Sequence, residues 1–331
     1  MKQQASERPI PSIQRKAAIA SGRAVDHRGS VRVEPIVDFD LDRTIFGTLE
    51  SKVARFVMRT RIAKDVSWDK AAALNMDRAY HDAREAYPLP AVDPALMRFL
   101  VEECDFDVEH ADGSFLDHLY FGFEYTTQHF GQYSPLVMLL HSILGTGTNT
   151  FAMKAEKIPE LRKLVSEFEW THVEAFPSIL RLLYDFGLRR DLRANRSRLA
   201  ELESIRFSRV IDNEPLLMSA EDLWIQLNYQ LIHLLDFLPV ANWSVHGNDT
   251  FFILFRDLYE LLESSGKRSV ELAYTPAVKG RELIGESQSF LGWLTTLIPM
   301  GLSEKMSAKS IRQFSERIGH SMNYELLWRS P

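Results

Sequence analysis

Apolar residues recur every three or four positions from Leu49 almost to the C-terminus, and this spacing predicts amphipathic helices. Asp93 before Pro94 is a typical helix start, as is Ser219 with Asp222 three residues later. Pro159 is expected to open the longest helix, with a kink at Pro177. Helices are predicted at about 49–57, 94–103, 115–130, 135–144, 159–186, 195–210, 220–238, 249–264, 281–298 and 303–318. The expected fold class is therefore all-α.

The N-terminal part lacks this periodicity. Residues 30–39 alternate and are rich in β-branched side chains, which predicts a short extended segment, although Pro35 favours an edge strand or a loop. Residues 1–30 hold six Lys or Arg, two Asp or Glu and few large apolar groups, a pattern typical of a mobile arm. We expect a mobile basic arm at 1–30 and a single bundle-like helical domain at 31–331.

Composition and charge narrow the class of protein. The 39 basic and 45 acidic residues give a net charge of −6, so no overall attraction to nucleic acid is expected. The single cysteine, Cys104, cannot form an intramolecular disulfide, which fits a reducing compartment, and the cytoplasm is expected. The longest apolar stretches, 135–145 and 290–302, are shorter than the roughly 20 residues of a membrane span, so no membrane partner is expected. Whether the protein forms a homo-oligomer is left open by the sequence.

Polar residues within apolar stripes are the candidates for chemistry. In the helix at 159–186, His172 falls on the inward series, and Glu169 precedes it on the same face. The resulting Glu-x-x-His can place both side chains on one metal ion.

The helix at 220–238 supplies a second set of polar residues. Beside its leucines this helix carries a polar stripe at helical spacing, made up of Gln226, Tyr229, Gln230, His233 and Asp236. His233 and Asp236 can both bind a metal, or Asp236 can orient His233. The third source is the helix at 115–130, where Glu124 and His129 lie about 140° apart, so we expect one of them to face inward. His141 lies among apolar neighbours and also needs a partner.

Carboxylates and histidines spread over several helices between residues 114 and 238 resemble the helical di-metal carboxylate oxidases and oxygenases, both ferritin-like and haem-oxygenase-like. The resemblance implies one or two iron ions between helices and an oxidase or oxygenase that acts on a small organic molecule. Gln230-Leu-Ile-His233 stands where a second Glu-x-x-His is found in ferritin-like proteins. The predicted metal ligands are Glu124, His129, Glu169, His172, His233 and Asp236, with Tyr125 and Gln230 as substrate contacts.

Three alternatives stay open. In a non-catalytic helical ligand-binding or regulatory protein, the buried histidines would be structural. A haem protein would use one histidine as its axial ligand. Residues 37–45 also resemble the first motif of haloacid-dehalogenase-type phosphatases, which implies Asp40 as nucleophile, Asp42 as acid and base, and a magnesium ion, although Arg43 stands where that family has glycine.

Overall fold

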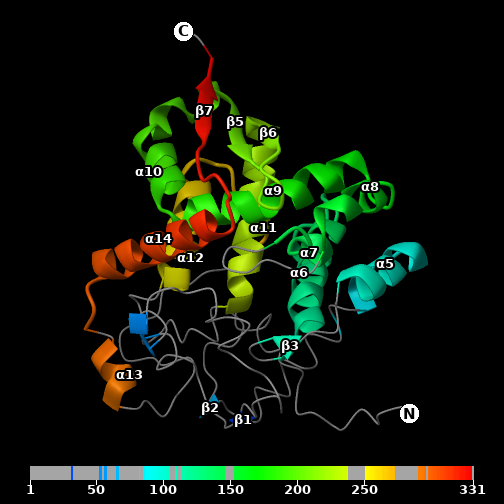
Figure 1. The fold of residues 1–331 in the computed structure, drawn as a ribbon, viewed down its shortest axis with the longest axis horizontal. Coiled ribbons are helices and arrows are strands. Elements are labelled where there is room, and N and C mark those ends of the chain that lie inside the picture. The colour runs from blue at the N-terminus through cyan, green and yellow to red at the C-terminus, as the bar shows by residue number, and fades with distance from the viewer. Residues whose placement is uncertain are drawn as a thin grey trace.

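The computed structural model describes residues 31–32, 52–53, 56–57, 65–66, 82, 85–104, 109–110, 113–145, 153–237, 250–272, 290–295 and 297–329. This part of the chain is mostly helical, as predicted, but it also contains a three-stranded antiparallel sheet (Figure 1). The expectation of a strictly all-α fold is therefore wrong. None of the helices in these ranges is long and apolar enough to cross a membrane. The predicted arm at 1–30 and the Asp40/Asp42 motif lie outside the described residues.

Helix α5 (Pro94–Cys104) begins as predicted. The Asp93 carboxylate accepts a hydrogen bond of 2.7 Å from the Ala95 amide and so caps the first turn. Leu96 and Leu100 on its inner face pack in a core cluster with residues of the helices α6 (Phe115–His129) and α7 (Leu136–Leu140).

Helices α6 and α7 approach each other closely at Gly122. A Cβ atom at this position would lie 2.6 Å from Met138 Cε, so the contact requires glycine or a shift of the methionine. This packing holds the segment that contains His141 against the rest of the helical core.

The region predicted as one helix from Pro159 is divided. The 3-10 helix η2 (Ala155–Lys157) and the short helix α8 (Ile158–Leu161) come first, and α9 (Glu167–Tyr184) begins only after Ser166. The Ser166 hydroxyl accepts from the Glu169 amide, and the Glu169 carboxylate accepts from the Ser166 amide. This capping box fixes the start of α9, and Pro177 lies inside the helix. The helix α10 (Gly187–Ala194) follows Phe186, whose φ is 73°.

The prediction of a helix at 195–210 is wrong. A 3-10 helix η3 (Arg196–Glu201) leads into strand β5 (Leu202–Ser208), which lies between β6 (Pro215–Ser219) and β7 (Glu325–Trp328). Leu199, Leu202 and Ile205 are three residues apart, which imitates a helical face, but a register irregularity between Leu202 and Ser204 produces the spacing within the strand.

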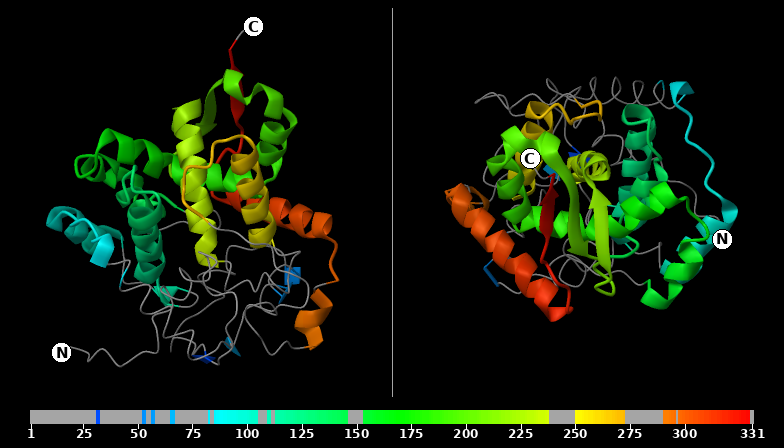
Figure 2. Two further views of the ribbon diagram at one scale, coloured as in Figure 1. Left: turned by 180° about the vertical axis from the view of Figure 1, so that it is seen from behind. Right: turned by 90° about the horizontal axis from the view of Figure 1, so that it is seen from above.

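The central helix is α11 (Ala220–Phe237), which contacts α6, α9, α12 (Thr250–Ser264) and β5. Figure 2 shows α11 and α12 side by side. The chain continues with α13 (Phe290–Thr295) and α14 (Met300–Arg317). The other strands in the described ranges form two short antiparallel pairs, β1 (Val31–Arg32) with β2 (Asp65–Val66) and the hairpin of β3 (Glu109–His110) with β4 (Gly113–Ser114). Only Val31–Arg32 of the predicted extended segment is described, and it is a strand.

Candidate functional site

His172 lies at the contact between α9 and α11 and is fully buried. Its Nδ1 is 3.0 Å from Gln226 Oε1, so Nδ1 carries the proton in this hydrogen bond. Its Nε2 lies 3.7 Å from Asp222 Oδ1, beyond hydrogen-bonding distance. Burial lowers the pKa of His172, an effect that the bond to Gln226 and the charge of Asp222 only partly oppose. The imidazole is therefore neutral near pH 7.

Glu169 is held at the start of the same helix by two other groups. One carboxylate oxygen accepts from the Ser166 amide at 2.7 Å, and the other accepts from the Ser134 hydroxyl at 2.6 Å. The Tyr229 hydroxyl donates to the Ser134 carbonyl at 2.8 Å, which ties α11 to the same turn. The Glu-x-x-His pair is therefore buried on one helix, as predicted, but its two side chains engage different partners.

His233 of α11 meets His141, which follows α7. The two ring centroids are 4.8 Å apart in an edge-to-face arrangement, and the Phe176 ring contacts both imidazoles. His141 Nδ1 lies 2.6 Å from the Met138 carbonyl oxygen and donates to it. The sequence marks His141 only as a polar residue in an apolar run, and its pairing with His233 depends on how α7 and α11 pack.

The other predicted residues have separate surroundings. Gln230 donates to the Phe176 carbonyl at 3.0 Å, and the Tyr125 hydroxyl donates to the Glu271 carbonyl at 3.0 Å. Glu124 is buried, whereas His129 is partly exposed and lies 3.9 Å from the Glu271 carboxylate. The side chain of Asp236 lies outside the described residues.

These positions do not assemble into a metal centre within the described ranges. No group of three or more His, Cys, Asp or Glu side chains there is able to hold a metal ion. Glu169 and His172 are held by separate groups, since Glu169 accepts from Ser134 and Ser166 while the Nδ1–H of His172 donates to Gln226. The Nε2 of His172 keeps its lone pair and has no hydrogen-bond partner among the described residues. The expected iron stays a prediction that these residues do not support.

An open pocket of about 430 Å³ lies between α10 and β7. Tyr324, Leu326 and Trp328 line it from alternate positions near and within β7, while Asp191 and Asn195 line it from α10 and its C-cap. The Tyr324 hydroxyl donates to the Asp191 carboxylate at 2.5 Å, and burial raises the pKa of Tyr324. The sequence does not predict this pocket, because β7 was not predicted as a strand and the two walls are separated by more than a hundred residues.

Comparison with known proteins does not indicate a function for these residues. No family model matches the chain, and neither the curated proteins nor the solved structures contain a significant match to it.

Proposed function

We propose that the protein is a non-catalytic helical binding or regulatory protein for a small organic molecule, and that its buried histidines are structural. The observation that carries this proposal is that Glu169 and His172 are held by separate groups and that no third His, Cys, Asp or Glu of the described residues completes a metal-binding group with them. A ligand set for a metal must offer free electron pairs directed at one point. The Glu169 carboxylate caps α9 and the His172 Nδ1–H bonds to Gln226 of α11, so both side chains stabilise the packing of α9 on its neighbours.

The pocket between α10 and β7 is the proposed binding site. Trp328 and Leu326 supply an apolar wall with an aromatic ring, and Asn195 and Asn323 supply amide groups that donate and accept. The Asp191 carboxylate, which accepts from the Tyr324 hydroxyl, has the capacity to accept a further hydrogen bond from a ligand. This lining suits a small molecule with one aromatic ring and hydrogen-bond donors at its other end.

Alanine substitution of the buried histidines separates this role from metal-dependent catalysis. We expect His172→Ala to destabilise the protein with no change in metal content, because the variant leaves Gln226 without its partner in the core. His320→Ala is the matched control, a buried histidine outside the predicted ligand set. Purified wild type, both variants and His233→Ala are compared by urea unfolding and elemental analysis. A stably folded His172→Ala that has lost stoichiometric iron or manganese would overturn the proposal.

The pocket itself is tested with a fragment library and ligand-observed NMR. Fragments with an aromatic ring and an amide or amine donor are expected to bind the wild type and to lose binding in Trp328→Ala. Trp293→Ala is the control, because Trp293 is an exposed tryptophan that does not line the pocket. If both variants bind the fragments as the wild type does, the pocket is not the site.

The contact between His141 and His233 favours a second candidate, a metal-dependent oxidoreductase. Two imidazoles from two segments are a typical start of a metal site, and the donation from His141 Nδ1 to the Met138 carbonyl fixes the orientation of that ring. A visible absorption spectrum with an elemental analysis of the protein tests this candidate. A colourless protein with trace metal after growth in iron-rich medium removes it.

A further inference from the structure

The segment from α13 to the first turn of α14 exposes large apolar side chains to solvent. We call this set the 290–302 surface, and its members are Phe290, Leu291, Trp293, Leu294, Leu297, Met300 and Leu302. Phe290 is 72% exposed and Leu297 is 62% exposed. Scattered exposed leucines are ordinary, but seven large apolar residues within thirteen positions mark an interaction surface.

The local structure explains why these side chains stay outside the core. Helix α13 is only six residues long, a turn closes it where the Leu297 amide donates to the Leu294 carbonyl, and Pro299 then precedes α14. Phe290 and Trp293 stack on each other with centroids 5.9 Å apart instead of inserting into the protein. Apolar residues therefore occupy several sides of α13, which is unfavourable in water and favourable at an apolar boundary.

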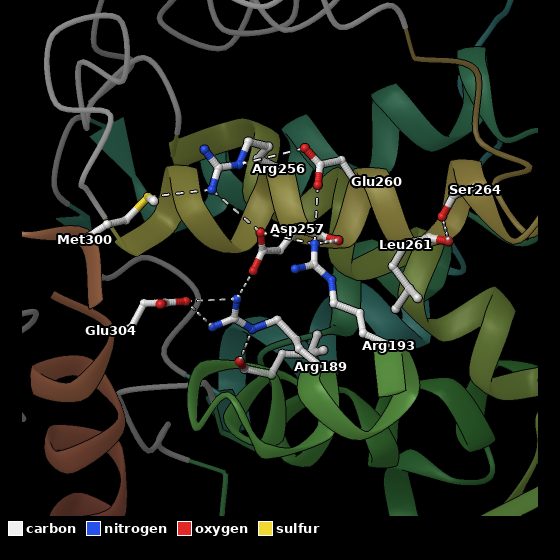
Figure 3. A network of polar contacts seen from close by, with 10 residues as sticks. Arg189, Arg193, Arg256, Asp257, Glu260, Leu261, Ser264, Met300 and Glu304 are labelled. Carbon is white, nitrogen blue, oxygen red and sulfur yellow. Dashed lines mark hydrogen bonds and ion pairs between the residues drawn. The ribbon is translucent and has the colours of Figure 1, made fainter. Parts of the chain in front are cut away.

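The exposed charged side chains within residues 290–309 have one sign. The exposed face of α14 carries Leu302, Lys305 and Lys309, which are spaced three and four positions apart. The one acidic residue of 290–309 is Glu304, and its carboxylate turns toward Arg189 at 3.4 Å (Figure 3). The exposed charge of this segment is therefore positive.

We propose that the 290–302 surface binds peripherally to an anionic lipid membrane. Phe290, Trp293 and Leu297 enter the boundary between headgroups and acyl chains, while Lys305 and Lys309 meet acidic headgroups. Tryptophan is favoured at this depth because its ring is apolar and its N–H stays hydrated. The shortness of the apolar stretch excludes only a spanning helix, since an interfacial segment lies along the membrane and needs no such length.

Charge complementarity distinguishes this occupant from a second copy of the chain. In a symmetric pairing through the same surface, Lys305 and Lys309 of both copies would gather around one patch. Residues 290–309 offer no exposed carboxylate to neutralise them, because Glu304 is directed to Arg189. Acidic lipid headgroups supply that negative charge.

Vesicle co-sedimentation of the full chain tests the apolar part of the proposal. The wild type is expected to sediment with vesicles of phosphatidylcholine and phosphatidylserine, and Trp293→Ala combined with Leu297→Ala is expected to stay in the supernatant. Leu217→Ala is the matched control, since Leu217 is a 65% exposed leucine on β6. Circular dichroism verifies that all variants are folded, which is expected because the substituted side chains are exposed.

A second variant tests the charged part. Each lysine near an anionic surface contributes about fivefold to the partition coefficient, so Lys305→Gln with Lys309→Gln should weaken binding by roughly 25-fold. The same variant should not change the weaker binding to vesicles of phosphatidylcholine alone. Lys154→Gln with Lys163→Gln removes the same charge from exposed positions elsewhere and should bind as the wild type does.

Two results would overturn the proposal. One is a wild type that sediments with neither kind of vesicle. The other is a wild type that does not bind vesicles and is dimeric by light scattering, while the variant with Trp293→Ala and Leu297→Ala is monomeric. That result would assign the surface to self-association.

Discussion

Arg189 and Asp257 form a buried ion pair between α10 and α12, with 2.5 Å between Nη1 and Oδ2 (Figure 3). Arg189 Nε also donates to the Leu183 carbonyl at 2.9 Å, and Glu304 of α14 approaches the same guanidinium. Burial lowers the pKa of Arg189, and the charges of Asp257 and Glu304 oppose that shift. The Arg189 guanidinium of α10 thus contacts α9, α12 and α14, and the two carboxylates of Asp257 and Glu304 stabilise its charge in the interior.

Asp257→Ala is therefore expected to lower the free energy of unfolding by about 3–5 kcal/mol, the usual loss when one partner of a buried pair is removed. Asp257 also lies 3.2 Å from Arg193, so the substitution leaves two neighbouring guanidinium groups without their shared carboxylate. Urea unfolding measures the loss. The control is Glu263→Ala, whose carboxylate pairs with Arg268 at a more exposed position and should change stability by less than about 1 kcal/mol. Equal losses in the two variants would contradict the prediction.

The capping box of α9 gives a second prediction. Ser166→Ala removes the hydroxyl that accepts from the Glu169 amide, and we expect a loss of about 1 kcal/mol in the free energy of unfolding. Thr171→Ala serves as control, because the Thr171 hydroxyl only bonds back to the Glu167 carbonyl within the same helix. Thermal unfolding followed by circular dichroism should place Ser166→Ala clearly below Thr171→Ala, and the reverse order would count against the capping role.

The helix starts show what the sequence can predict. Asp93 and Ser219 act within three residues of themselves, so their caps were predicted from the sequence and are present. Ser166 with Glu169 is an equally local signal, but the apolar periodicity that begins near Pro159 led to the wrong start for α9. Strand β7 pairs with β5, which is more than a hundred residues away in the sequence, and no local sequence pattern predicts that pairing.

For the candidate site residues, burial could be predicted from the sequence, but the partner of each side chain could not. Periodicity correctly placed His172 and His233 on buried faces, because burial depends on each helix alone. Which side chains meet depends on the packing of two helices, and there the sequence had no information. His172 meets Gln226, and His233 meets His141, which was not among the predicted ligands.

The contact between α6 and α7 gives a third prediction. Gly122→Ala places a Cβ 2.6 Å from Met138 Cε and 3.0 Å from Met138 Cβ, so the helices must separate or the methionine must move. Overpacking of this kind typically costs about 1–3 kcal/mol. Met138→Ala combined with Gly122→Ala should cost less than the sum of the two single substitutions, as measured by urea unfolding. Additive losses would contradict a direct clash.

His320 predicts how stability depends on pH. Its Nε2 lies 3.1 Å from the Ser208 carbonyl, and its pKa is lowered to about 4, chiefly by burial, with Arg181 adding to the shift and the Ser208 bond opposing it. Between that value and the ordinary pKa near 6.5, the unfolded chain binds a proton that the folded protein excludes. The contribution of His320 is thus complete above about pH 6.5 and is lost as the pH falls toward 4, by at most about 1.4 kcal/mol per pH unit.

His172 acts in the same direction, because burial also lowers its pKa, so the wild type should lose stability on acidification through both groups. His320→Gln cannot take up that proton, and an amide nitrogen can still donate to the Ser208 carbonyl. Urea unfolding at about pH 7 and about pH 5 should therefore show a smaller loss in His320→Gln than in the wild type. The carboxylates of the chain titrate in both proteins and cancel from this comparison. An equal loss in the two proteins would show that His320 is protonated as readily in the folded state as in the unfolded chain.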